Sequence, residues 1–236
     1  MEYMLFVALA FATSMISAVF GFGTALVLLA IGSQILPVQE TIALATVSFA
    51  ASTITKSFLF ARHIDWKMAA IMALASLPFA YFGASLVADA PGDLIRRLLG
   101  AMILIYVVLT SFDLLPRFRI AMPGLVAGSA GYGFISGLLG SGNVVKAILF
   151  REMNITKHAF VGAMAATSVL SNVAKLIAYS RSDLLMPVHL WPSVALVAAA
   201  IAASYAGRRS LHHFTETHFE LGLKILLAVA AIGLLV

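Results

Sequence analysis

Two lysines, Lys56 and Lys175, lie inside strongly apolar stretches of the chain, 119 residues apart. Hydroxyl side chains precede each lysine by four and eight positions, a spacing that places them on one face of a helix. The two stripes are Ser48, Ser52 and Lys56, and Thr167, Ser171 and Lys175, with Asn172 beside the second. Ammonium, hydroxyl and amide groups together can replace the water around an oxyanion. Because a cation within hydrocarbon is costly and usually functional, we expect these stripes to bind an anion.

Glycine breaks recur at the same offset of 119 residues. Gly21 and Gly23 interrupt the first half of the chain, and Gly140 and Gly142 interrupt the second. Glycine lets the backbone turn sharply and approach a ligand closely. A helix that follows such a break exposes free N–H groups and its positive dipole end, which favours an anion. Polar residues next to the breaks complete the predicted site: Ser17, Thr24, Ser136, Ser141 and Asn143.

Other roles for these residues stay open on the sequence alone. Lys56 lies six residues before Arg62, about 9 Å along a helix, so its ammonium could reach the lipid headgroups. Serines in membrane helices also serve simply to let two helices pack closely. Lys146 is either a third contact to the anion or another lysine that reaches the headgroups. The appearance of the same stripe in both halves favours the binding role.

Composition indicates that lipid is the solvent of this chain. Of its 236 residues, 62% are hydrophobic and only 11% are charged, with a mean hydropathy of +1.03. A soluble domain carries about 25% charged residues. The formal charge of +5 comes from bases scattered in short loops, which is typical of membrane topology and not of nucleic-acid binding. There are no cysteines, so disulfides and thiolate chemistry are excluded.

The elements that must position the site are ten apolar segments, five in each half. A helix needs about 20 residues to cross a hydrocarbon core of about 30 Å, and two of the segments, 23–36 and 142–150, are too short. Each of these two follows a glycine break. We therefore expect each half to contain a glycine-broken helical hairpin plus about three full transmembrane helices. The ten segments are 3–20, 23–36, 38–61, 66–88, 94–115, 121–139, 142–150, 155–180, 187–207 and 219–236.

Each half then crosses the membrane an odd number of times, so the second half is inserted upside down relative to the first. The predicted fold is an all-α polytopic integral membrane protein with two inverted-topology repeats, residues 1–116 and 117–236. Inversion would place Lys56 nearer the cytoplasm and Lys175 nearer the outside. Loops on one side hold nine basic residues against three on the other, which predicts that both termini lie outside.

The absence of certain residue types and motifs from the sequence narrows the possible functions further. No Asp or Glu lies centrally in any predicted segment, whereas proton-coupled carriers commonly use such a carboxylate. An inside-negative potential drives anions outward by about 2.3 kcal/mol per charge per 100 mV, so export needs no coupled ion. The sequence also holds no metal-binding motif and no catalytic constellation, so we expect neither a cofactor nor an enzyme.

These features resemble the sulfite exporter TauE/SafE family of bacterial and archaeal membrane proteins over nearly the whole chain. Each half is similar to the family's pattern of a glycine-rich break, a short helix and an Ala/Ser/Thr-rich helix. The Ala/Ser/Thr-rich helices contain Ala45-Thr46-Val47-Ser48 and Ala165-Ala166-Thr167-Ser168. The resemblance implies transport of sulfite, an organosulfonate or a related small anion, and it implies a place in the bacterial cytoplasmic membrane.

The leading hypothesis is a secondary carrier that exports a small sulfur-containing oxyanion, bound near the membrane midplane between the two glycine breaks. The alternatives are an anion channel with the same site and a carrier of a different small anion, such as a carboxylate. The expected partners are the anionic substrate, the lipid bilayer and, as an option, further copies of the chain. Nucleic acid is not among them.

Overall fold

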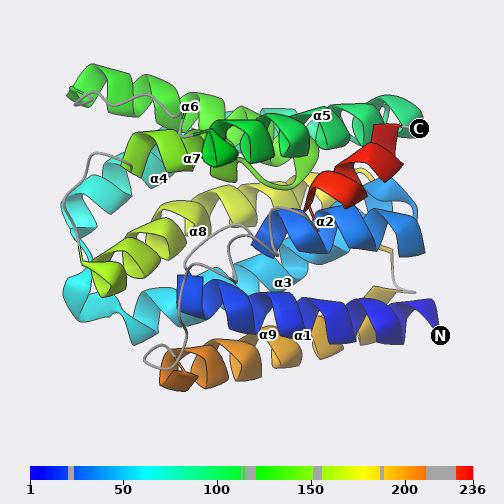
Figure 1. The fold of residues 1–236 in the computed structure, drawn as a ribbon, viewed down its shortest axis with the longest axis horizontal. Helices are drawn as coiled ribbons and strands as arrows, with labels where there is room; N and C mark the ends of the chain where they lie inside the picture. Colours follow the sequence, from blue (N-terminus) through cyan, green and yellow to red (C-terminus); the bar gives the residue numbers. More distant parts are fainter. Residues whose placement is uncertain are drawn as a thin grey trace.

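The structure is a computed structural model that describes residues 1–20, 24–112, 114, 121–150, 156–186, 189–210 and 227–235. Figure 1 shows that the described chain is a bundle of helices, most of which run along its longest axis. The described part contains no strand, and residues 227–235 form a last helical stretch. The other elements are α1 (Glu2–Phe20), α2 (Thr24–Ile35), α3 (Val38–Leu59), η1 (Ala61–His63), α4 (Trp66–Ser85), α5 (Gly92–Ser111), α6 (Met122–Leu139), α7 (Asn143–Phe150), α8 (Lys157–Arg181) and α9 (Leu190–Ser210).

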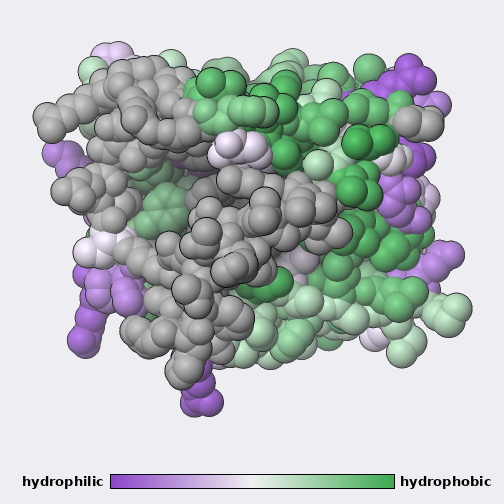
Figure 2. All heavy atoms as spheres, in the orientation of Figure 1, coloured by the Kyte–Doolittle hydropathy of each residue, from purple (hydrophilic) through white to green (hydrophobic). Residues whose placement is uncertain are grey.

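Six described helices are long and apolar enough to cross a membrane, and they are α3, α4, α5, α6, α8 and α9. Hydrophilic residues gather at the two ends of the long axis, and hydrophobic residues cover much of the surface between them (Figure 2). The start of α1 and the helical stretch 227–235 lie at the same end (Figure 1). The chain is therefore a multi-pass membrane protein, as the sequence predicts. α6, the arm that precedes the second glycine break, has 18 residues and is also long enough to cross.

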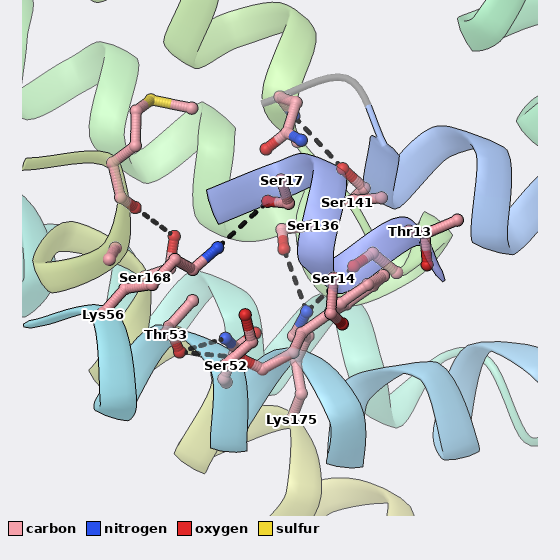
Figure 3. A pocket seen from close by; sticks show the side chains of 18 of the residues that line it. Thr13, Ser14, Ser17, Ser52, Thr53, Lys56, Ser136, Ser141, Ser168 and Lys175 are labelled. Atoms are coloured by element: carbon pink, nitrogen blue, oxygen red, sulfur yellow. Dashed lines mark hydrogen bonds between the residues drawn. The ribbon is translucent and has the colours of Figure 1, made fainter. Parts of the chain in front are cut away.

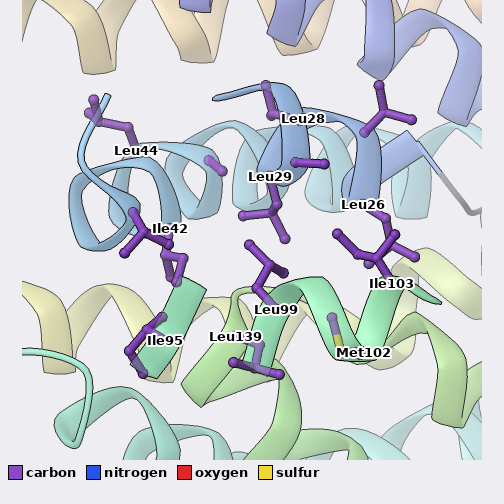
Figure 4. Close-up of a cluster of buried hydrophobic side chains, with 14 of the residues drawn as sticks. Leu26, Leu28, Leu29, Ile42, Leu44, Ile95, Leu99, Met102, Ile103 and Leu139 are labelled. Carbon is purple, nitrogen blue, oxygen red and sulfur yellow. The ribbon is translucent and has the colours of Figure 1, made fainter. Parts of the chain in front are cut away.

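The helices after the glycine breaks are short, as predicted. α2 has 12 residues and α7 has 8, which gives lengths of about 18 Å and about 12 Å at 1.5 Å per residue. Neither length crosses a hydrocarbon core of about 30 Å. Non-helical backbone ahead of such a helix is tolerated only where protein or a wet cavity surrounds it. Leucines of α2 pack between α3 and α5, so this short arm is held inside the bundle (Figure 4).

Helix ends follow local chemistry. The carboxylate of Asp65 caps α4 by accepting the Met68 N–H at 3.0 Å. The hydroxyl of Thr156 caps α8 in the same way, accepting the Ala159 N–H at 3.3 Å. α6 ends at Gly140, whose φ of +79° is a left-handed conformation that only glycine adopts without strain.

Helices of one half pack against helices of the other half in matched pairs. The 119-residue offset relates α1 to α6, α4 to α9 and α3 to α8. α1 packs against α9 and α6 packs against α4, while α3 and α8 pack against each other. Glycines allow the close approach: a Cβ added at Gly83, Gly133 or Gly137 would meet the backbone of the facing helix of the α4–α6 pair. These pairings support a two-fold relation between the halves.

Candidate functional site

A cavity of about 60 Å³ lies among α1, α3, α6 and α8 and the residues that join α6 to α7. Both predicted lysines line it, as do one hydroxyl of the predicted stripes, Ser52, and the second glycine break. The predicted residues on its wall are Ser17, Ser52, Lys56, Ser136, Gly140, Ser141, Gly142, Asn143, Asn172 and Lys175. The structure thus brings side chains from both halves of the chain to one place.

The two lysines make equivalent contacts in the two halves. Lys56 Nζ donates to Ser17 Oγ at 3.0 Å, and Lys175 Nζ donates to Ser136 Oγ at 3.1 Å. Lys175 also donates to the carbonyl oxygen of Gly140 at 3.0 Å. Figure 3 shows both ammonium groups reaching toward these serines. Lys56 is 5% exposed and Lys175 is 1% exposed, so neither reaches toward the lipid headgroups.

A direct contact between equivalent positions lies at the same cavity. Asn172 Nδ2 donates to Thr53 Oγ1 at 3.1 Å, and these residues are separated by 119 positions. Two positions related by a two-fold operation touch each other only close to its axis. Both residues also line the cavity. Equivalent positions of the two halves therefore meet at the cavity, and Lys56 and Lys175 reach it from opposite halves.

Three other predicted residues that the structure describes, Ser48, Thr167 and Ser171, do not line the cavity. Ser48 lies behind its wall, 3.5 Å from Ser14 Oγ, and Ser171 Oγ lies 3.2 Å from the hydroxyl of Tyr132. Thr167 is also buried and contacts Lys146. Ser48 and Ser171 thus contact residues that face the cavity, and Thr167 contacts a lysine behind the wall. Gly21 and Gly23 lie outside the described residues, as does the side chain of Thr24.

Several wall residues were not predicted as site residues. Thr13, Ser14, Thr53, Tyr132 and Ser168 contribute hydroxyls to the cavity. A signal for two of them was present, because Thr13 and Tyr132 are both polar and differ by the repeat offset. Tyr132 also precedes Ser136 by four residues and so shares its helix face. Its ring packs against Gly142, where an added Cβ would lie 2.6 Å from Tyr132 Cδ2. A side chain at this position of the glycine break would therefore clash.

The positive charge around the cavity has no acidic partner in the described part of the chain. Lys146 is fully buried next to the wall, which rules out a position at the headgroups. None of Lys56, Lys146 and Lys175 has a described carboxylate within 4 Å. A buried charge is costly unless an opposite charge or several hydrogen bonds compensate it. An anion in this cavity would supply that charge.

The cavity suits a small anion. One buried water needs about 10–15 Å³ of such a cavity, so this cavity has room for on the order of four to six water molecules. That is the size of an ion with a few heavy atoms. Gly142 and Asn143, at the N-terminal end of α7, also line the cavity, and this end of a helix favours negative charge.

A family model described as "Sulfite exporter TauE/SafE" matches residues 6–234 of the chain. No curated protein and no solved structure matches it. The matched range covers both glycine-containing halves and every described residue of the cavity. The family is one of membrane transporters for sulfite and related sulfur anions. The chain belongs to the sulfite exporter TauE/SafE family.

Proposed function

We propose that the protein is a secondary carrier that exports a small sulfur-containing oxyanion, such as sulfite or an organosulfonate, across the bacterial cytoplasmic membrane. The observation that carries this proposal is the presence of two equivalent buried lysines on one small cavity, without a carboxylate partner among the described residues. A third buried lysine lies behind the wall. Such a site is electrostatically incomplete until an anion enters it.

Each group on the wall has a distinct part in the proposed binding. Lys56 and Lys175 supply charge, and Ser17 and Ser136 hold their ammonium groups in place when the cavity is empty. Lys175 has three N–H donors and two protein acceptors, so one donor remains for the anion. The hydroxyl of Ser52, the amide of Asn172 and the start of α7 supply further hydrogen bonds.

The proposed transport cycle uses the relation between the halves. We propose that residues 1–116 and 117–236 are inverted repeats, with both termini outside, and that their relative motion opens the cavity to either side in turn. The matched pairs α1–α9 and α6–α4 support this arrangement, because each joins one helix from either half. The membrane potential then suffices for export.

The direct test is flux of radiolabelled or ion-detected sulfite, thiosulfate, methanesulfonate and acetate in proteoliposomes. We expect uptake that is accelerated by the same anion on the opposite side, and we expect a loss of at least about a hundredfold in Lys56→Ala and Lys175→Ala. Lys67→Ala is the matched control, because Lys67 is an exposed lysine at the start of α4. Full flux in both cavity variants would overturn the site. Single-channel currents without exchange would establish a channel, and preference for acetate would establish a carboxylate carrier.

A further inference from the structure

Lys146 breaks the correspondence between the two halves. The position 119 residues earlier is Val27, which is also buried, so the first half has an apolar side chain where the second has a cation. The neighbouring aromatic residue differs as well, because Tyr132 corresponds to Thr13. The lysines Lys56 and Lys175 are a pair, whereas Lys146 occurs once. The repeat therefore does not explain the role of Lys146.

The hydrogen-bond partners of Lys146 suit a charged ammonium. Its Nζ contacts the carbonyl oxygen of Met164 at 3.1 Å, Thr167 Oγ1 at 2.7 Å and Ser168 Oγ. Both hydroxyls give their own hydrogens to backbone carbonyls, Thr167 to Ala163 at 2.7 Å and Ser168 to Met164 at 2.8 Å. All three partners therefore accept from the lysine. A neutral amine has two N–H groups, so this arrangement of three acceptors matches the three donors of the ammonium form.

The same hydrogen bonds exclude direct contact between Lys146 and a ligand in the cavity. Its three N–H groups are all used by protein acceptors, and it is not part of the wall. The ring of Tyr132 covers it, with 4.1 Å between Nζ and the ring centroid. Ser168 and Tyr132 do line the cavity, so the charge lies one side chain behind the wall. Lys146 can act on an anion only through its field and through the orientation of these two hydroxyls.

We propose that Lys146 is a specificity-determining positioning residue, whose charge behind the wall makes the cavity prefer divalent to monovalent oxyanions. The inference rests on the proposed function of the cavity. Coulomb attraction scales with the charge of the ligand, so a cation next to the wall favours a dianion twice as strongly as a monoanion. At about 6 Å and an effective dielectric constant of about 20, this preference amounts to on the order of a hundredfold in relative affinity.

Thiosulfate and methanesulfonate provide a matched pair of probes, because both are tetrahedral with five heavy atoms and they differ by one negative charge. The measurement is the ratio of their competition constants against sulfite uptake in one proteoliposome preparation. A ratio does not depend on how much of the protein is folded. We expect Lys146→Met to lower the thiosulfate-to-methanesulfonate preference by at least tenfold, and Lys67→Met to leave it unchanged.

Two further variants keep the test decisive if Lys146→Met does not fold. Lys146→Gln retains N–H donors for the Thr167 and Ser168 hydroxyls but removes the charge, and we expect it to lose the preference as well. Lys146→Arg retains the charge and should keep the preference within about threefold of the wild type. An unchanged ratio in a charge-free variant that still transports would overturn this inference alone. If the wild type transported none of these anions, the proposed function itself would be overturned instead.

Discussion

A Lys175→Met variant distinguishes between two roles of this lysine, binding of the ligand and stabilisation of the fold. The substitution keeps an unbranched side chain only one atom shorter, removes the charge and removes two hydrogen bonds, to Ser136 Oγ and the Gly140 carbonyl oxygen. Hydrogen bonds from charged donors are worth about 1.5–3 kcal/mol each. Removing a buried charge that has no ionic partner returns several kcal/mol. Because these terms oppose each other, we expect the free energy of unfolding of the empty protein to change by less than about 2 kcal/mol.

The effect of a ligand on the same variant should be large. In the wild type, thiosulfate at about 100 times its dissociation constant stabilises the protein by about 2.7 kcal/mol, or roughly 5–11 °C in melting temperature. One unit charge at about 4 Å and a dielectric constant of about 20 contributes on the order of 4 kcal/mol per ligand charge. Its loss weakens binding by on the order of a thousandfold for each ligand charge, and so by at least about a thousandfold for thiosulfate, which reduces the stabilisation at that concentration to about 0.1 kcal/mol or less.

The assay is thermal unfolding of detergent-purified Lys175→Met, Lys67→Met and wild type, with and without thiosulfate. We expect similar melting temperatures without ligand and a ligand-induced shift in the wild type and the Lys67→Met control only. A shift of wild-type size in Lys175→Met would refute the reasoning, since the charge would then be irrelevant to binding. A loss of more than about 4 kcal/mol without ligand would also refute it, because the lysine would then be structural.

Two other predictions concern the packing around the cavity. Gly133→Ala should destabilise the protein by about 1–3 kcal/mol, because its Cβ would overlap the Ser76 carbonyl oxygen on α4. Gly131→Ala is the control and should be neutral or stabilising in thermal unfolding, because its Cβ meets nothing within 4 Å. A double-mutant cycle of Thr53→Val and Asn172→Ala should show a coupling of about 0.5–1.5 kcal/mol in unfolding, from their 3.1 Å hydrogen bond. Additive effects in that cycle would contradict a direct contact between these two equivalent positions.

The order and lengths of the described helices could be predicted from the sequence because their boundaries carry strong local signals. Asp65 and Thr156 cap the starts of α4 and α8, and Gly140 ends α6 in a conformation that favours glycine. In so apolar a chain, a lysine within a segment is conspicuous. This is why Lys56 and Lys175 could be singled out and why both are found on one cavity.

The hydroxyl lining of the cavity could be predicted only in part. Helices that are apolar on every side give no amphipathic pattern, so the sequence does not show which face of α1 or α6 turns inward. The inward face is decided by packing between the halves, and this packing brings Thr13 and Tyr132 to the wall while Ser48 and Ser171 lie behind it. The position of Lys146 behind the wall depends on the same packing. The residues around it in the sequence do not show whether it contacts the anion or reaches the headgroups.

The departures from ordinary membrane packing coincide with the cavity. Elsewhere the described chain follows the rules for lipid: leucines of α2 fill the space between α3 and α5, and glycines bring α4 and α6 into close contact (Figure 4). At the cavity, three lysines are buried without a described acid, and hydroxyls replace aliphatic side chains. Proteins keep such energetically unfavourable buried groups where function requires them. Under the proposed function, the binding of a negatively charged substrate is what offsets the cost of these buried groups.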